Sequence, residues 1–364
     1  MVLSLRPRQR HAVIELLNLT KNSNKSSIAA SFGANADADA DEANNYKLLI
    51  LDAFTHDVIA PLVTVKDLRD HGVTLHLRLR QEREQIPDVP AVYFVSPTPE
   101  NVKAISGDFA NSLYDAYHLN FASALPASAL EELATSAVRG GVDGRVKCVR
   151  DQYLGYVSLE DDLFDLAIDD GYRLLHDPRV AEKDVERLIA NVTTGLFSAC
   201  VTLGQVPVIR SQRGGAAEMV AKELESRIRD ALAQRDNPFE GGLRAQYGGS
   251  SVQRPLLCLF DRNFDLTAML QHAWTYQPLV HDVLRMRLNR VDVDADAPTG
   301  VTTGAKPKSY TLEHSDPFWA ENASAQFPKV AEEVEAELAK YKEAIKRVNA
   351  QAAMADGDAD ALGN

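Results

Sequence analysis

Four short apolar segments, separated by stretches long enough for a helix, constrain the fold of this chain more than any other feature. The run Leu48-Leu49-Ile50-Leu51 carries no polar side chain, which is typical of a strand buried on both faces. The predicted strands cover residues 47–52, 72–77, 91–96 and 117–122, and helix-forming stretches at 63–71 and 101–114 lie between them. Strands that alternate with helices predict a doubly wound α/β domain with a parallel sheet.

The segments on either side of this pattern predict a helix, a loop and a second domain. Residues 3–19 have the spacing of an amphipathic helix, and the polar segment 21–45 predicts a flexible loop. A glycine-rich turn at 140–144 places the end of the first domain, residues 1–148. A second α/β domain, residues 149–260, follows, with predicted helices at 181–203 and 216–232 and predicted strands at 206–210 and 255–261.

The last hundred or so residues predict a loop and one long helix. Residues 292–308 are rich in Asp, Gly, Thr and Pro, which is typical of a loop. After it, an apolar residue recurs every three or four positions, as on one face of a helix, at Val330, Val334, Leu338, Tyr341 and Ile345.

Composition excludes several classes of function. The formal net charge of −13 over 364 residues argues against a binder of nucleic-acid backbones, which needs a concentrated excess of Lys and Arg. The three cysteines form no CxxC pair, so neither a disulfide framework nor a zinc site is indicated and a reducing cytosol is expected. About 20 consecutive apolar residues occur nowhere, so membrane association is expected only through partners.

The sequence offers little for catalysis, and no catalytic residue, metal or cofactor is predicted. Asp52 follows a strand, but Phe54 stands where a phosphatase using an Asp nucleophile needs its second acid, so a helix cap is favoured. Arg213-Gly214-Gly215 before a helix favours a structural turn over an anion site. His272 and His281 are interpreted as core or interface residues. An α/β enzyme that processes nucleotides or phosphate esters with Asp52 or Asp261 and a metal remains an alternative.

One long block resembles the most distinctive sequence of a known family. It runs from Asp261 through Arg262, Asp265 and Met269 and continues as Trp274-Thr275-Tyr276-Gln277 to Leu284. This block resembles the Sec/Munc (SM) family of syntaxin-binding SNARE regulators. The segments Tyr93 to Asn101 and Asp151 to Phe164 resemble the same family, and Met269 points to its ER-to-Golgi branch.

The resemblance implies an arch of three domains, of which this chain holds only part. The two α/β domains would be followed by the start of a mostly helical third domain at 261–364, and the chain is expected to be an N-terminal fragment. In the family block, Asp261 and Asp265 flank Arg262, and ion pairs among them would fix how one domain meets the next. Trp274 and Tyr276 complete this structural motif.

The resemblance also implies a binding pocket for the N-terminal peptide of a Golgi syntaxin. Its positions correspond to Leu130, Leu133, Ala134, Val146 and Val149. The first three share a helical face, and the two valines would close the other wall if they lay on a helix. The alternative interpretation is that all five are core residues, and periodicity alone favours this alternative. Replacing Leu133 with Lys is expected to abolish peptide binding with the fold intact.

Four basic residues near this pocket and the expected partners complete the sequence-based hypothesis. Arg139, Arg145, Lys147 and Arg150 would attract an acidic peptide segment or form a solvated surface. The resemblance implies a non-enzymatic, monomeric, cytoplasmic protein that reaches ER and Golgi membranes through SNAREs. It would bind a syntaxin and SNARE complexes and promote vesicle fusion. A tethering scaffold without SNARE contact remains a further alternative.

Overall fold

The computed structural model describes residues 4–19, 46–235, 237–239, 254–293, 308–313 and 315–361. The chain forms two compact units, residues 1–264 and 265–364. The predicted loop 21–45 lies outside the described residues, as does most of the predicted loop 292–308. Each unit is described by itself below.

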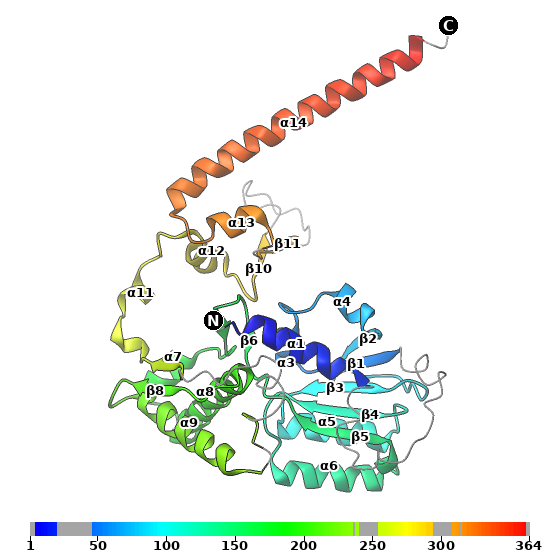
Figure 1. The fold of residues 1–364 in the computed structure, drawn as a ribbon, viewed down its shortest axis with the longest axis vertical. Helices are drawn as coiled ribbons and strands as arrows, with labels where there is room; N and C mark the ends of the chain where they lie inside the picture. The colour runs from blue at the N-terminus through cyan, green and yellow to red at the C-terminus, as the bar shows by residue number, and fades with distance from the viewer. Residues whose placement is uncertain are drawn as a thin grey trace. The chain divides into compact units, whose positions relative to one another are not determined.

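A five-stranded parallel sheet forms the centre of the first unit (Figure 1). Its order is β2-β1-β3-β4-β5, with β1 at Lys47–Leu51, β2 at Val73–Arg78, β3 at Ala91–Val95, β4 at Tyr117–Phe121 and β5 at Val146–Asp151. The predicted fold class is confirmed, and the four predicted strands lie within one residue of the observed ones. Every residue of β1 and β3 is buried, as a strand covered on both faces requires. The fifth strand was not predicted.

Helices cover both faces of this sheet (Figure 1). On one face lie α5 (Pro99–Ala110) and α6 (Ala127–Arg139), which bury Ile105, Phe109, Leu133 and Ala137 against strand residues such as Tyr93 and Leu119. On the other face lie α1 (Arg6–Leu17) and α3 (Ala53–Ile59). The short α4 (Val65–Asp70) precedes β2. The predicted helices at 3–19, 63–71 and 101–114 are therefore present, with shifted ends.

Helix α1 joins the sheet to the segments that follow it. The side-chain amide of Gln9 is fully buried and makes two hydrogen bonds to the backbone of the segment 156–158. Its Nε2 donates to Tyr156 O at 2.6 Å, and Ser158 N donates to its Oε1 at 3.3 Å. Arg8 Nη1 donates to Leu203 O at 2.6 Å, at the end of α8. Because Lys47 Nζ in β1 also donates to Leu17 O at 2.7 Å, the N-terminal helix links the first sheet to residues of the predicted second domain.

The rest of the first unit contains the predicted elements of the second α/β domain. After the antiparallel pair β6 (Val157–Ser158) and β7 (Phe164–Asp165) come α7 (Gly171–His176), α8 (Glu182–Leu203), β8 (Val208–Ser211), α9 (Ala216–Ala233) and β9 (Leu256–Leu259). Strands β8 and β9 pair in parallel. The predicted boundary between residues 148 and 149 falls inside β5, so the first sheet continues to Asp151. The division into domains stays a prediction.

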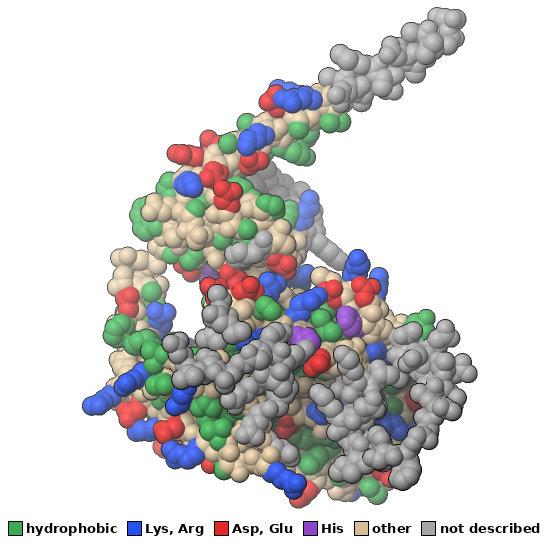
Figure 2. Space-filling view, viewed as in Figure 1, with side chains coloured by type: hydrophobic (Ala, Val, Ile, Leu, Met, Phe, Trp, Pro, Cys, Tyr) green, Lys and Arg blue, Asp and Glu red, His purple; other side chains and the backbone are tan. Residues whose placement is uncertain are grey.

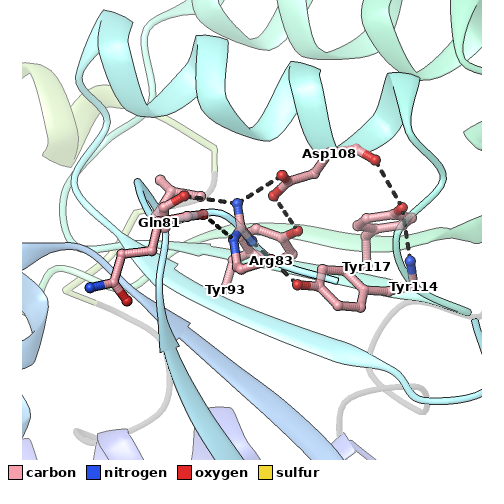
Figure 3. A network of polar contacts seen from close by, with 7 residues as sticks. Gln81, Arg83, Tyr93, Asp108, Tyr114 and Tyr117 are labelled. Carbon is pink, nitrogen blue, oxygen red and sulfur yellow. Dashed lines mark hydrogen bonds and ion pairs between the residues drawn. The ribbon is translucent and has the colours of Figure 1, made fainter. Parts of the chain in front are cut away.

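A buried polar network on the α5 side of the sheet was not predicted (Figure 3). Arg83 Nη2 donates to Asp108 Oδ1 at 2.7 Å and to Leu79 O at 2.8 Å, and the Tyr93 hydroxyl donates to Asp108 Oδ2 at 2.8 Å. Burial raises the pKa of Asp108, and the neighbouring Arg83 opposes that rise. The network fixes the loop between β2 and β3 against the end of α5.

The second unit contains short elements followed by one long helix. Its elements are α11 (Thr267–Leu270), α12 (Tyr276–Leu284), the antiparallel pair β10 (Arg290–Val293) and β11 (Lys308–Thr311), α13 (Pro317–Asn322) and α14 (Phe327–Ala361). Val280, Val291, Trp319 and Ala323 form its small core. The predicted apolar stripe lies on α14, where Val330 is buried and the other four residues are exposed. Among the described residues, no helix is both long and apolar enough to cross a membrane.

Candidate functional site

The three predicted pocket residues on helix α6 differ in whether they are buried or exposed. The Leu133 side chain is 3% exposed and belongs to the core, whereas Leu130 is 46% exposed and Ala134 also faces solvent. Leu133 and Ala137, four residues apart, define the inner face of the helix. The expectation that Leu133 is an accessible pocket residue is therefore wrong, because its side chain fills the space between α6 and the sheet.

The two predicted valines lie on strand β5 rather than on a helix. Successive side chains of a regular strand alternate between faces, so residues three apart would point to opposite sides. A bulge changes this: Val146 pairs with Tyr117 and Val149 pairs with Leu119, so one extra residue of β5 is accommodated between them. Tyr117 and Leu119 share the α6 side of the sheet, and both valines therefore face that side.

Three of the five predicted residues are exposed apolar side chains, and we call the five together the α6–β5 strip. Leu130, Ala134 and Val149 are its exposed members, and Val149 is 38% exposed. Beneath them, Leu133 lies in the core cluster against which Val146 packs. β5 is the last strand of the sheet and lies beside α6 in Figure 1. Of the five predicted residues, the structure thus leaves three exposed and Val146 half-buried, and it buries Leu133.

The charges beside the strip have both signs. Arg139, Arg145 and Lys147 are exposed, and so are Glu131, Glu132 and Asp143 in the same segments. Lys147 Nζ donates to Gly144 O at 3.0 Å, and Arg145 Nη1 donates to Tyr114 O at 3.4 Å. On the face shown in Figure 2, basic and acidic side chains are likewise interspersed. Electrostatics at this surface therefore does not favour an acidic peptide over a basic one.

The opposite face of β5 carries a separate cluster. Arg150 and Cys148 point there, and Cys148 Sγ lies 3.6 Å from His118 Nδ1. Burial, reinforced by the positive charges of Arg150, Lys147 and Lys47, lowers the pKa of His118 to about 4. His118 is therefore neutral at physiological pH. Arg150 lies on the other side of the sheet from the strip and does not contribute to it.

Asp261 of the family block caps a helix. Its Oδ1 accepts a hydrogen bond from Ala217 N at 2.9 Å, in the first turn of α9, and its own amide donates to Gln212 Oε1 at 3.2 Å. In the part of the first unit that the structure describes, no ion pair joins Asp261 to Arg262, so the predicted pairing of these two is wrong. Asp265 Oδ1 accepts from Thr267 N at 2.9 Å. The two aspartates therefore order backbone, Asp261 at the start of α9 and Asp265 next to itself at Thr267.

Tyr276 and the backbone of Trp274 contact α13 and α14 within the second unit, which fits the structural role predicted for them. The Tyr276 ring lies 5.5 Å from that of Trp319 and 6.5 Å from that of Phe327. Trp274 O accepts from Phe327 N at 2.9 Å, while its side chain is exposed. His272 and His281 are also exposed, so they are not core residues, and their interpretation as interface residues stays a prediction.

Gly215 has a residue-specific role beside this cap. A Cβ at this position would collide with the Asp261 carboxylate. We expect Gly215→Ala to displace the cap and lower the free energy of unfolding by about 1–3 kcal/mol, measured by urea denaturation. Gly107→Ala is the matched control, because no atom lies within 4 Å of its added Cβ, and it should be neutral or stabilising. Equal effects of the two substitutions would contradict this role.

The residues considered for catalysis are already bonded within the protein. Asp52 Oδ1 accepts from Thr55 N and Oδ2 accepts from Ser96 N, each at 2.7 Å, and Asn101 Nδ2 also donates to Oδ2 at 2.7 Å. The predicted helix cap is confirmed. Asp52 follows β1 at the point between β1 and β3 where the strand order of the sheet reverses, which is the usual ligand position in such sheets. Protein donors already occupy its carboxylate. Among the described residues, no group of three His, Cys, Asp or Glu is arranged to hold a metal.

Comparison with known proteins identifies the family. The model of the Sec1 family matches residues 47–362. The chain belongs to the Sec1 family. It is 45% identical over 351 residues to the SEC1 family transport protein SLY1 of Arabidopsis thaliana, covering 96% of this chain and 52% of the relative. It is 36% identical over 346 residues to Protein SLY1 of Saccharomyces cerevisiae, covering 94% of this chain and 51% of the relative.

Solved Sec1-family structures have the same fold. The structure described as Sly1p in complex with an N-terminal peptide of Sed5p matches with a TM-score of 0.72 and 32% identity, covering 96% of this chain and 55% of that one. The SM protein Vps45 in complex with the Qa SNARE Tlg2 matches with a TM-score of 0.73 at 24% identity, covering 94% and 55%, which supports the fold alone. The predicted Sec/Munc membership and ER-to-Golgi branch are confirmed. The chain spans about half the length of the relatives it matches.

Proposed function

We propose that this chain binds the N-terminal peptide of a Golgi or ER syntaxin and promotes SNARE assembly and vesicle fusion in ER-to-Golgi transport, without catalysing a reaction. The observation that carries this proposal is the α6–β5 strip, where Leu130, Ala134 and Val149 remain exposed over a buried apolar base. The related structure of Sly1p with a Sed5p peptide supports a peptide partner.

An aromatic side chain of the peptide is the group that this strip suits. A flat ring laid over Leu130 and Val149 removes apolar surface from water on both partners, at about 25 cal/mol per Å². Buried aromatic anchors of this kind contribute on the order of 2 kcal/mol or more to binding. Because Leu133 and Val146 already pack in the core, the base of the strip needs no rearrangement to accept the ring.

In this proposal, binding to the syntaxin determines where the protein acts. The protein works as a monomer in the cytoplasm and reaches ER and Golgi membranes peripherally, through the syntaxin and its SNARE complexes. An enzymatic role has no support from Asp52 or Asp261, since both carboxylates cap helices.

Titration of a syntaxin N-terminal peptide onto the chain by calorimetry tests the proposal. We expect Leu130→Lys to weaken binding at least about tenfold, because the charged side chain prevents the ring from seating and tenfold is only 1.4 kcal/mol. Leu232→Lys is the matched control, since Leu232 is also a helical leucine with 46% exposure but lies on α9. Full affinity in Leu130→Lys, or equal loss in both variants, would exclude the strip as the binding site.

A further inference from the structure

The first unit contains a pocket that the proposed function does not use. Its volume of about 530 Å³ is in the range of sites that enclose a small ligand. Its lining includes residues that follow the carboxyl ends of β1, β3 and β4, the segment 166–168, and residues of α8 and α9. We call this the sheet-end pocket.

The sheet-end pocket lies at the end of the sheet where doubly wound folds bind ligands. Phe54 follows β1 and Ser96 follows β3, and the strand order of the sheet reverses between these two strands. In open α/β sheets, ligands bind outside the carboxyl ends of the strands at such a point. The Asp52 carboxylate is bonded within the protein at the same point, so the pocket is the space left for a ligand.

The lining of the pocket indicates the charge of its ligand. Among the described residues, the lining includes one charged side chain, that of Arg227, and no carboxylate. This holds in a chain with 52 Asp and Glu residues against 39 Lys and Arg residues. The partly buried side chains of Phe54, Leu166 and Ile168 provide apolar surface in the same lining. The pocket therefore suits a ligand that combines an apolar body with a negative charge.

Arg227 lies at the wall of the pocket and has N–H groups to spare. Its Nη1 donates to Oγ1 of Thr194, another lining residue, at 2.5 Å, and its Nη2 donates to Glu223 Oε1 at 2.6 Å. These bonds use two of the five N–H donors of a guanidinium, and the side chain stays 35% exposed, so a ligand can reach the others. Ser123 and Asn191 also line the pocket, and neither side chain has a hydrogen bond within the described part of the chain.

The charge balance around Arg227 selects the kind of anion. Glu223 already offsets part of the positive charge, so a ligand with one negative charge matches what remains. A carboxylate carries one charge and accepts two parallel N–H bonds from a guanidinium, whereas a phosphate group carries about −1.5 to −2 at pH 7. We propose that the sheet-end pocket binds a small organic carboxylate, whose apolar body lies against Phe54 and Ile168 and whose carboxylate pairs with Arg227.

A saturation-transfer NMR titration of the full chain with cinnamate as the probe tests this proposal. We expect Arg227→Gln to weaken binding about tenfold, because one charge-assisted pair is lost. Arg229→Gln is the matched control and should leave binding unchanged. Arg229 also pairs with a glutamate four residues earlier on α9, at 2.7 Å, but does not line the pocket. Cinnamamide, the neutral analogue, should bind wild type about tenfold more weakly than cinnamate and should not distinguish the two variants.

A second variant tests the apolar part of the pocket. Ala124→Trp, at an exposed lining residue, should weaken the binding of both probes at least about fivefold, because the indole occupies space that the ligand needs. Ala110→Trp, at an exposed position of α5 outside the lining, should leave both affinities unchanged. Circular dichroism checks that both variants are folded. If Ala124→Trp unfolds, Arg227→Gln decides.

The outcomes separate this site from general attraction to charge or to apolar surface. Equal loss in Arg227→Gln and Arg229→Gln, equal affinity of wild type for cinnamate and cinnamamide, or no binding of cinnamate would each overturn the proposal. Displacement of cinnamate by inorganic phosphate at constant ionic strength would show that Arg227 binds free anions without an organic body, and would also overturn it.

Discussion

Replacing Leu133 with lysine should unfold the first sheet. The side chain is 3% exposed and lies in the cluster formed by α5, α6 and the strands, where an ammonium would have neither water nor a partner. Burying an unpaired charge and losing the leucine together should remove at least about 4 kcal/mol of unfolding free energy. This corrects the expectation from sequence that Leu133→Lys would leave the fold intact and report on binding alone.

Neighbouring positions on α6 provide the comparison. Leu133→Ala should lower the unfolding free energy by about 2–4 kcal/mol, whereas Leu130→Ala, at a half-exposed position, should cost less than about 1 kcal/mol. Urea denaturation followed by far-UV circular dichroism measures all three variants. A Leu133→Lys protein with wild-type stability would show that Leu133 faces solvent after all.

The Arg83→Met substitution has the second largest expected effect. It removes the cation whose Nη2 lies 2.7 Å from Asp108 Oδ1 and leaves a buried carboxylate with only the Tyr93 hydroxyl as a side-chain donor (Figure 3). Breaking a buried ion pair from one side typically costs 3–5 kcal/mol, so we expect a loss of about that size in urea denaturation at pH 7.

Two further variants separate the ion pair from the loss of arginine packing. Asp108→Leu in the Arg83→Met background removes the orphaned carboxylate and should recover part of the stability. Arg80→Met removes a mostly exposed arginine from the same loop, whose pair with Glu100 is 3.9 Å long, and should cost less than about 1 kcal/mol. If Arg83→Met is as mild as Arg80→Met, the network does not hold the loop.

The sequence predicted the central strands well because burial on both faces leaves a strong pattern. Leu48 to Leu51 form such a run, and β1 follows it within one residue. Strand β5 has the opposite character: it lies at the sheet edge, mixes valines with Lys147 and Arg150, and contains a bulge. Its pattern suits a surface helix or a loop equally well, so it was missed.

The candidate site could be predicted only in part, because burial depends on partners distant in sequence. Leu130 and Leu133 are both apolar and three residues apart, and only the packing of α6 on the sheet makes one exposed and the other buried. Likewise, Asp261 meets Ala217 through the pairing of β8 with β9, which no local pattern shows. The resemblance located the right segments, and the structure distinguishes exposed from buried residues within them.

A double-mutant cycle between Leu130 of the chain and the aromatic residue of a syntaxin N-terminal peptide tests the central claim most directly. Calorimetry would compare wild type and Leu130→Ala, each with the native peptide and with a peptide whose aromatic residue is alanine. If the ring seats on the α6–β5 strip, the two losses should not add, and a coupling energy of about 1 kcal/mol is expected. Losses that add within about 0.3 kcal/mol would show that the ring binds elsewhere.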